Sequence, residues 1–396
     1  MNSTLLYCYP NRIFSENDEF YYSTIAYLFR DLSKFFKKMY LVAPVADFRT
    51  EQLRRFCETP QLKVIKTKSY RNRFFWGAQK YFWSFQNVPK FKEYQHRADV
   101  VVINIPSALT CLAYLPLINK PLVVRVVGDE QKVTRVSTSL RCKIECSSRF
   151  LKLRELAEQY LLKKANAIIC RNDKFKDKIV KKYGLSRSKV SVIVPAINTD
   201  IFKPLDLDYR QKIKENLELK ANQLVIGFVS MNISRAKGAV TLLKAFSRLH
   251  NENPQVKILL IGKDKLGLEG NPSIICCGLV NKNELPYYYN AMDILVFPSR
   301  SEGAPKVVME AFACGIPVVA SNVGAISDWI KDGENGFLIE PGDVNKIVDC
   351  CRKLLESEEL RTKIGKAARK YAVQNFDHIE LTKKNVDVIK GIIPEK

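Results

Sequence analysis

The chain has 396 residues, of which 46% are hydrophobic, 27% charged and 10% aromatic. This length suggests two or three domains of roughly 150 residues each, and the composition excludes disordered, collagen-like and coiled-coil proteins. The formal net charge is +23, and it is unevenly distributed. Residues 1–200 contain 36 Lys and Arg against 17 Asp and Glu, whereas residues 201–396 contain 28 against 24. The first half is therefore expected to face an anionic partner.

Eleven cysteines, several of them inside apolar runs, and the lack of a secretory signal sequence predict reduced thiols in a cytoplasmic protein. Cys142 and Cys146 are spaced like one half of a metal site, but no second cysteine pair and no nearby histidine completes four ligands. We therefore expect neither a metal ion nor a bound cofactor.

Apolar runs that fit buried strands recur along the whole chain. They span residues 5–10, 39–45, 99–105, 121–127, 166–171 and 190–196 in the first half, and 224–230, 256–262, 273–278, 293–299, 316–321 and 336–341 in the second. Continuous Val, Ile and Leu runs indicate strands covered on both faces, and helical stretches between them require parallel crossover connections. The uncharged stretch 100–119 is long enough for a membrane span, but Pro106 and Pro116 divide it into strand, turn and short helix. The sequence predicts two doubly wound α/β domains.

The domain boundary is expected near residue 200, where residues 198–208 interrupt the pattern with a proline and several turn-forming residues. We predict a first domain over residues 1–199, a second over residues 200–375, and a C-terminal helix over residues 376–396 that packs back towards the first domain. Ligands of open parallel sheets bind beyond the carboxyl ends of the strands. Functional residues should therefore lie in the loops that follow strands.

The segment SRSEGAPKVVMEAFACGIPVVAS, residues 299–321, carries the most specific signal. A strand ends in a polar turn with Glu302 and Gly303, Pro305 fits the first turn of a helix, and a glycine ends that helix. The start of such a helix has unpaired N–H groups and a partial positive charge, and therefore favours a phosphate. Glu310 would lie about two turns further on, roughly 10 Å along the helix axis.

The segment FVSMNISRAKGAVTLLKAF, residues 228–246, has the same order of strand, polar loop and amphipathic helix. Its loop supplies positive charge from Arg235 and Lys237. A lysine beside a diphosphate neutralises the negative charge that grows as a glycosyl bond breaks, and loss of such a donor commonly costs about 3 kcal/mol. We expect the helix start at Gly303 and the ammonium of Lys237 to meet across an interdomain crevice and to hold the diphosphate of a sugar nucleotide.

These segments, with VPAINTDIFKP (194–204) and GENGFLIEPGD (333–343), resemble the retaining glycosyltransferases of family 4, the glycosyl transferases of group 1. The resemblance covers nearly all of residues 190–375, while the first half is similar only in strand order. It implies a GT-B fold, in which two Rossmann-like domains face each other across a cleft. It also implies transfer of a hexose-type sugar from a UDP- or GDP-sugar to a hydroxyl of a glycan or lipid-linked acceptor, in polysaccharide or glycolipid assembly.

The resemblance implies a role for individual positions. Glu302 would contact the transferred sugar, Glu310 the nucleotide ribose, and Lys237 the departing phosphates. It implies two further groups of donor contacts. The diphosphate would be held by the helix start, at Gly303, Ala304, Pro305, Lys306 and Val307. The base would lie against a loop, at Leu279 and Val280. Transfer in the family retains the anomeric configuration by attack on the leaving-group face and requires no metal.

This chain departs from the family pattern in three places. Many members have an arginine five or six residues before the lysine, where this chain has Asn232 and Met231, so Arg235 is the candidate substitute. A histidine that is common at the end of the strand 121–127 is also absent, and Asp129 is the candidate there for binding sugar or acceptor. The glycine-rich loop after the first strand has no counterpart in this chain.

Residues 49–97 contain twelve Lys and Arg against three acidic residues, mixed with aromatic residues such as Phe74, Trp76 and Trp83. Rings and basic side chains together suit an anionic membrane surface, where each basic residue contributes about 1 kcal/mol. Peripheral attachment to the inner face of the cytoplasmic membrane would follow. The alternative is that the rings cover the first domain's sheet and the charges are solvated. No nucleic-acid-binding motif accompanies the segment.

Two other functions compete with sugar transfer. The departures from the family pattern allow a partner subunit that keeps the nucleotide-sugar site but has lost catalysis. An enzyme of the same fold with other chemistry, such as an epimerase or a phosphorylase, is disfavoured because the sequence has no signature of a lysine-anchored cofactor. Slow hydrolysis of the donor would separate the enzyme from the binding subunit.

Overall fold

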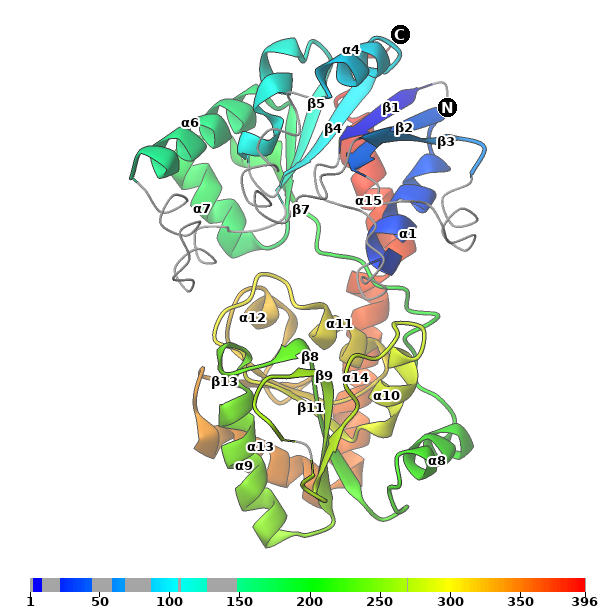
Figure 1. Ribbon diagram of the computed structural model, residues 1–396, viewed down its shortest axis with the longest axis vertical. Coiled ribbons are helices and arrows are strands. Elements are labelled where there is room, and N and C mark those ends of the chain that lie inside the picture. Colours follow the sequence, from blue (N-terminus) through cyan, green and yellow to red (C-terminus); the bar gives the residue numbers. More distant parts are fainter. Residues whose placement is uncertain are drawn as a thin grey trace. The chain divides into compact units, whose positions relative to one another are not determined.

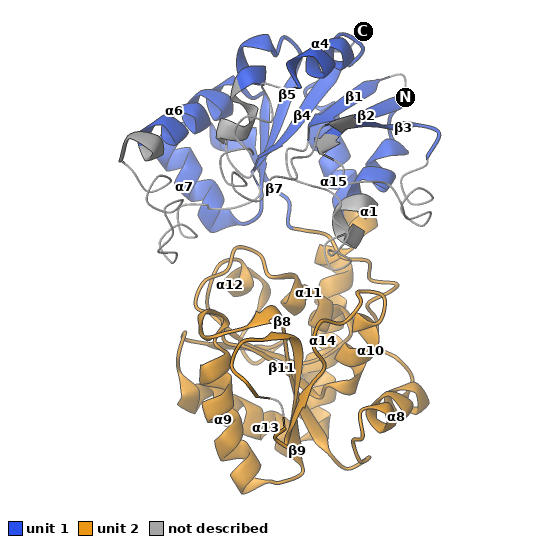
Figure 2. Cartoon of the chain, in the orientation of Figure 1, with its two compact units in different colours: residues 1–194, 381–396 blue, residues 195–380 orange. Residues whose placement is uncertain are grey.

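The computed structural model describes residues 3–8, 22–44, 59–67, 87–105, 108–126, 148–268 and 270–395. The chain divides into two compact units (Figure 2). Unit 1 comprises residues 1–194 and 381–396, and unit 2 comprises residues 195–380. Strands alternate with helices in both units (Figure 1). The predicted α/β class with two doubly wound domains is confirmed.

Over its described residues, unit 1 contains a seven-stranded parallel sheet in the order β3-β2-β1-β4-β5-β6-β7. The strands are β1 (Thr4–Cys8), β2 (Lys38–Pro44), β3 (Leu62–Thr67), β4 (Val100–Ile105), β5 (Leu122–Val126), β6 (Ala167–Cys170) and β7 (Val190–Val192). Six of them fall within or beside the predicted apolar runs. The exception is β3, an edge strand in which Lys63 and Lys66 interrupt the apolar residues, as charged residues commonly do at sheet edges.

Helices cover the sheet of unit 1 and complete its core. They are α1 (Tyr22–Ser33), α4 (Val88–His96), the 3-10 helix η1 (Ala108–Leu117), α6 (Ser148–Lys164), α7 (Asp173–Tyr183) and the short η4 (Arg187–Lys189). Phe91 of α4, Leu161 of α6 and Ile179 of α7 are buried against the strands. The uncharged stretch forms β4 and η1, as predicted. None of the helices in the described ranges is both long and apolar enough to cross a membrane.

Unit 2 contains, over the residues that the structure describes, a six-stranded parallel sheet in the order β10-β9-β8-β11-β12-β13. The strands are β8 (Leu224–Ile233), β9 (Val256–Asp264), β10 (Ile274–Cys276), β11 (Ile294–Phe297), β12 (Val318–Ser321) and β13 (Phe337–Ile339). The chain winds outwards from β8 to β10, then returns to the other side of β8 with β11. The strand order therefore reverses between β8 and β11, the place where doubly wound sheets bind ligands.

The helices of unit 2 lie on both faces of this sheet (Figure 1). They are α8 (Leu207–Asn216), the 3-10 turn η5 (Arg235–Lys237), α9 (Ala239–Glu252), α10 (Leu285–Ala291), α11 (Lys306–Ala313), α12 (Ile326–Trp329), α13 (Val344–Glu356) and α14 (Glu358–Phe376), and α15 (His378–Lys390) contains residues of both units. Helices α9 and α13 bury side chains such as Leu242 and Ile347 against β8, β9 and β11.

Candidate functional site

Two loops meet at the point where the strand order of unit 2 reverses. Strands β8 and β11 are parallel neighbours, with Ile226 opposite Ile294 and Gly227 opposite Leu295. The turn η5 follows β8, and the polar segment that carries Glu302 follows β11. Because the carboxyl ends of parallel strands lie at one edge of the sheet, these two loops are brought together.

The central contact in this site joins Lys237 to Glu302. The ammonium Nζ of Lys237 donates a hydrogen bond to Oε1 of Glu302 over 2.8 Å, and the hydroxyl of Ser299 donates to the same oxygen over 2.7 Å. Ser299 is fully buried, while the side chains of Glu302 and Lys237 are 12% and 40% exposed. Oε2 of Glu302 makes no hydrogen bond to a described residue, so it stays available to a ligand.

This geometry corrects one expectation. The helix start and Lys237 were expected to meet across an interdomain crevice, but Lys237, Glu302 and Gly303 all belong to unit 2. The reason is the adjacency of β8 and β11, which brings together residues 65 positions apart within one sheet. The pair therefore forms without any contribution from unit 1.

Gly238 sets the position of Lys237. Its φ of +79° is left-handed, and a Cβ on this residue would lie 1.9 Å from the carbonyl oxygen of Pro298. Gly238 is also the residue that ends η5 and caps α9. Only glycine allows this conformation and this close approach, so Gly238 lets the turn with Lys237 pack closely against the loop that carries Glu302.

Replacing Gly238 with alanine should lower the free energy of unfolding of unit 2 by more than about 2 kcal/mol, because a left-handed φ and a backbone clash must both be accommodated. Gly267 is the matched control, since its φ is +70° and a Cβ there would have no atom within 4 Å. Gly267→Ala should cost only about 1 kcal/mol, which is the conformational cost alone. Denaturant unfolding followed by circular dichroism measures both. Equal losses would mean that the contact with Pro298 is easily relieved.

The start of α11 lies in the same loop as Glu302. Pro305 is its N-cap residue and makes no side-chain hydrogen bond to the first turn, where the N–H groups have no partner within the helix. Gly303 has open space where a Cβ would be, and Ala304 is small. Lys306 and Val307, which open the helix, are half-buried. Such a helix start has the polarity that an anion requires.

Gly324, which was not predicted from the sequence, packs closely against this loop. Its φ is +60°, and a Cβ would approach the carbonyl oxygen of Glu302 to 2.4 Å. The next residue, Ala325, donates its N–H to the carbonyl of Gly303 over 2.9 Å. Gly324 follows β12, so a search of every loop after a strand would have found it.

Glu310 lies inside the unit and is only 4% exposed. Its Oε2 accepts a hydrogen bond from the hydroxyl of Tyr289, a fully buried residue of α10, over 2.8 Å. Burial raises the pKa of Tyr289 well above its usual value, and the carboxylate of Glu310 raises it further. Burial lowers the pKa of Lys282, and the Glu310 carboxylate opposes that decrease. Tyr289 and Lys282 thus both interact with the carboxylate of Glu310, and neither was predicted from the sequence.

The remaining predicted positions lie in η5, after β10 or outside the described residues. The side chain of Arg235 is exposed in η5 and makes no hydrogen bond or ion pair to a described residue. Leu279 and Val280 follow β10, with Leu279 59% exposed and Val280 buried. A buried Val280 can shape the loop, but Leu279 has the accessible surface that a base could contact. Asp129 lies outside the described residues.

No group of three or more His, Cys, Asp or Glu in the described part of the chain is arranged to hold a metal ion. The cysteines that the structure records as free are Cys8, Cys170, Cys276, Cys277, Cys314, Cys350 and Cys351. Burial raises the pKa of Cys170 and of Cys277 to about 11, which makes these thiols poor nucleophiles. The Cys142 and Cys146 pair lies outside the described residues.

Both halves of the chain match models of glycosyltransferase families. Residues 29–201 match the model described as Glycosyltransferase Family 4, and residues 209–371 match the model described as Glycosyl transferases group 1. The capsular polysaccharide biosynthesis glycosyltransferase CapM of Staphylococcus aureus is 30% identical over 233 residues, which are 55% of this chain and 60% of CapM. A D-inositol 3-phosphate glycosyltransferase of Corynebacterium jeikeium is 27% identical over 237 residues, 56% of each chain. The chain thus spans little more than half the length of these curated relatives.

Solved structures with low sequence identity share the whole fold. Sucrose-phosphate synthase from Thermosynechococcus elongatus has a TM-score of 0.75 at 18% identity, over 98% of this chain and 99% of that one. WaaG, a glycosyltransferase involved in lipopolysaccharide biosynthesis, has a TM-score of 0.71 at 20% identity, over 98% and 100%. The predicted GT-B class is confirmed by these likenesses. The two family matches follow one another along most of the sequence. The chain therefore belongs to the glycosyltransferases of group 1 and family 4.

Proposed function

We propose that the protein is a retaining glycosyltransferase that moves a hexose-type sugar from a nucleoside diphosphate sugar to a hydroxyl of a glycan or lipid-linked acceptor, in polysaccharide or glycolipid assembly. The pair of Lys237 and Glu302 beside the start of α11 carries this proposal. CapM is named for capsular polysaccharide biosynthesis, and HepE from Anabaena, a structure with a TM-score of 0.69 and 18% identity, was solved with UDP-glucose. A UDP-sugar is therefore the first donor to test, followed by a GDP-sugar.

Lys237 has spare hydrogen-bonding capacity for a diphosphate. An ammonium has three N–H donors, and the contact with Glu302 uses one of them. Glu302 holds the ammonium in the loop that leads into α11, where the N–H groups of Gly303, Ala304, Lys306 and Val307 lie. The ammonium and the helix start would therefore both face the same anion. In this proposal they stabilise the departing diphosphate in place of a metal ion, and no bound cofactor takes part. Arg235 is the further cation that could contact it.

Glu302 and Glu310 would hold the two ends of the donor. The free Oε2 of Glu302 would accept a hydrogen bond from a hydroxyl of the sugar, and the buried carboxylate of Glu310, fixed by Tyr289, would accept from the ribose. The bond between the anomeric carbon and the diphosphate oxygen breaks, and the acceptor oxygen forms its bond on that same face. Its proton passes to the leaving diphosphate. The configuration at the anomeric carbon is thereby retained.

Binding of the donor should raise the melting temperature of the protein. A ligand at a hundred times its dissociation constant adds about 2.7 kcal/mol of stability, which corresponds to roughly 5–10 °C for a unit of this size. A thermal-shift panel of UDP, GDP, ADP and their sugars would identify the base. No shift with any nucleoside diphosphate would contradict the proposal.

A catalytically inactive binding subunit remains the alternative, because the chain lacks the arginine and histidine common in the family. An active enzyme and an inactive binding subunit would both show the thermal shift, but only the enzyme would slowly hydrolyse its donor when no acceptor is present. Release of free sugar, measured with the donor found in the panel, therefore separates the two. Nucleotide binding without any release of sugar or transfer to acceptors would favour the binding subunit.

We also propose that unit 1 attaches peripherally to an anionic membrane on the cytoplasmic side. Most of the basic aromatic segment 49–97 lies outside the described residues, but α6 offers independent support. Leu153, Leu156 and Tyr160 share one stripe of this helix and are 51%, 62% and 53% exposed. Lys152 and Lys163 are exposed beside the stripe. An apolar stripe flanked by lysines suits the interface of an anionic bilayer.

Replacing both Leu153 and Leu156 with glutamate should lower the fraction of protein that sediments with vesicles of phosphatidylcholine and phosphatidylserine by about tenfold. Each exchange removes apolar contact and adds repulsion from the lipid headgroups. Val373 of α14 is the matched control, because it is an exposed apolar residue on a helix of unit 2, 42% accessible. Val373→Glu should sediment like the unaltered chain. Unchanged sedimentation of the double variant would show that α6 does not contact the membrane.

A further inference from the structure

A cavity in unit 2 lies at the edge of the sheet opposite to the Lys237 and Glu302 pair. It has a volume of about 400 Å³, and Asp293 and Pro317, which line it, directly precede β11 and β12. Glu302 follows the opposite end of β11, a strand of four residues that spans roughly 13 Å. The cavity is therefore distinct from the proposed donor site.

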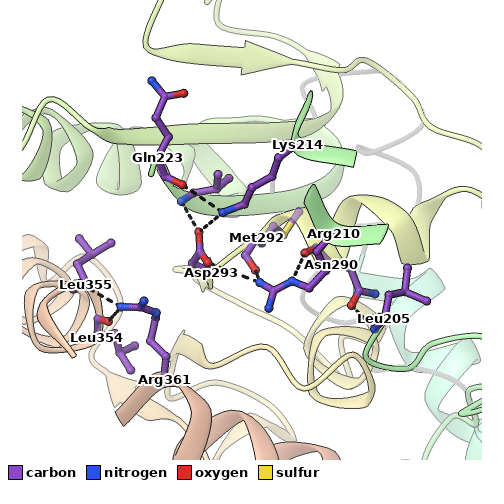
Figure 3. A network of polar contacts seen from close by, with 11 residues as sticks. Leu205, Arg210, Lys214, Gln223, Asn290, Met292, Asp293, Leu354, Leu355 and Arg361 are labelled. Carbon is purple, nitrogen blue, oxygen red and sulfur yellow. Dashed lines mark hydrogen bonds and ion pairs between the residues drawn. The ribbon is translucent and has the colours of Figure 1, made fainter. Parts of the chain in front are cut away.

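The lining of this cavity carries excess positive charge. Its five cationic side chains are Arg210, Arg361, Lys366, Arg369 and Lys370, and its two carboxylates are those of Asp293 and Glu358. The formal excess is three positive charges. Asp293 also has partners outside the lining, because its Oδ2 accepts a hydrogen bond from Nζ of Lys214 over 3.1 Å (Figure 3). The same oxygen accepts a hydrogen bond from the N–H of Val225 over 2.8 Å. Its second oxygen lies 3.6 Å from Arg210.

Two of the arginines are held in place by neutral groups. Nη1 of Arg361 donates to the carbonyls of Leu354 and Leu355 over 2.6 and 3.0 Å, at the end of α13 (Figure 3). Nη1 of Arg369 donates to the carbonyls of Thr199, Phe202 and Ala313 over 2.8 to 3.0 Å. Carbonyls fix a guanidinium without cancelling its charge.

Several nitrogens of these two arginines remain available to a ligand. Nε and Nη2 of Arg361 and of Arg369 make no hydrogen bond to any described residue. Burial lowers the pKa of Arg369, and Cys314, Asp200 and Asp377 oppose this decrease without outweighing it. The guanidinium of Arg369 is thus partly desolvated and incompletely compensated, a condition that an anion would relieve.

One face of α14 presents most of these cations. Arg361, Gly365 and Arg369 are spaced four residues apart, and Lys366 and Lys370 lie next to the last two. Gly365 allows the helix to approach closely, because a Cβ there would lie 2.2 Å from the carbonyl oxygen of Gly315. The backbone of α14 thereby forms the bottom of the cavity, while Lys366 and Lys370 are exposed at its edge.

We propose that this cavity binds a phosphate monoester of a small organic molecule. Bidentate guanidinium groups and lysines are the side chains that recognise phosphate, and a volume of about 400 Å³ lies in the usual range of small-molecule sites. Pro204, Leu205 and Ile316 give one wall an apolar surface for the organic part. The site is independent of the proposed sugar transfer, because it shares none of the residues assigned to the donor.

Isothermal titration of the full chain with inorganic phosphate and with glycerol 3-phosphate tests the proposal, with UDP present in excess to occupy the donor site and glycerol as the uncharged control. Both phosphates should bind saturably and glycerol should not. Replacing Lys366 and Lys370 together with glutamine should weaken phosphate binding by about tenfold or more. Neither lysine side chain makes a hydrogen bond or an ion pair to a described residue, so the double variant should keep its melting temperature. Lys363→Gln, on α14 but outside the cavity lining, should bind as the unaltered chain does.

Lys237→Ala distinguishes this site from the donor site. If the cavity binds phosphate, Lys237→Ala binds both probes with unchanged affinity, even if the proposed function is wrong. Loss of phosphate binding in Lys237→Ala would place the anion in the donor site and overturn the proposal. Absence of saturable binding, or equal binding by the Lys366 and Lys370 double variant, would overturn it as well.

Discussion

Glu302→Gln is expected to lower the turnover of sugar transfer by about a hundredfold or more, with UDP affinity unchanged or slightly higher. Glutamine keeps the size of the side chain, and its amide oxygen can still accept from Ser299 and Lys237. The second carboxylate oxygen, which has no described partner, becomes an NH₂ group and can no longer accept from a sugar hydroxyl. Lys237 also loses its counterion, which strengthens its attraction for the nucleotide diphosphate. Steady-state rates and calorimetric titration with UDP measure the two effects separately.

The control for this substitution is Glu356→Gln, an exposed position at the end of α13 in the same unit. It should change neither turnover nor UDP affinity. Melting temperatures of both variants should stay close to that of the unaltered chain. An equal loss of turnover and UDP affinity in Glu302→Gln would contradict the assignment of this carboxylate to the sugar and would place it on the nucleotide.

Lys237→Ala should also lower turnover by about a hundredfold, and in contrast to Glu302→Gln it should weaken UDP binding by about tenfold. The substitution removes the ammonium that would face the diphosphate. It also leaves the carboxylate of Glu302, which is only 12% exposed, without its cation and close to a second anion. Steady-state kinetics and UDP titration provide the readouts, and Lys244→Ala, at an exposed position of α9, is the control.

The double variant Lys237→Ala with Glu302→Gln tests the physical cause of that weaker binding. If repulsion from an unpaired Glu302 contributes, the double variant binds UDP more tightly than Lys237→Ala alone, and the two substitutions are not additive. Strict additivity in UDP affinity would show that the two residues do not interact in the nucleotide complex. Normal turnover in Lys237→Ala would remove this residue from the mechanism.

Most strands of both sheets could be predicted because the relevant signal is local. A strand covered on both faces, such as β4 or β11, is a continuous apolar run, and this property can be read without knowing the neighbours. The edge strand β3 escaped prediction, since its lysines resemble those of a solvated loop. Edge strands need fewer apolar residues because one of their sides has no neighbouring strand.

The proposed donor site was predicted only in part. The spacing of Glu302 from the end of β11 and of Lys237 from the end of β8 placed both residues in loops at a ligand-binding edge. Ser299 could also have been found, because it lies two residues beyond the end of β11. Tyr289 gave no signal, since α10 and α11 meet only through tertiary packing, and its hydrogen bond to Glu310 spans 21 positions of sequence.

The sequence by itself determined all strands but β3, and it placed a lysine and a glutamate each just beyond a strand of the second sheet. Tertiary structure alone decided that β8 and β11 are neighbours, and with that the pairing of Lys237 with Glu302 inside one unit. Tertiary structure likewise brings Arg210 of α8 to the cavity whose other cations lie on α14. Local propensity depends on nearby residues, whereas strand order depends on which surfaces pack best after the whole chain has folded.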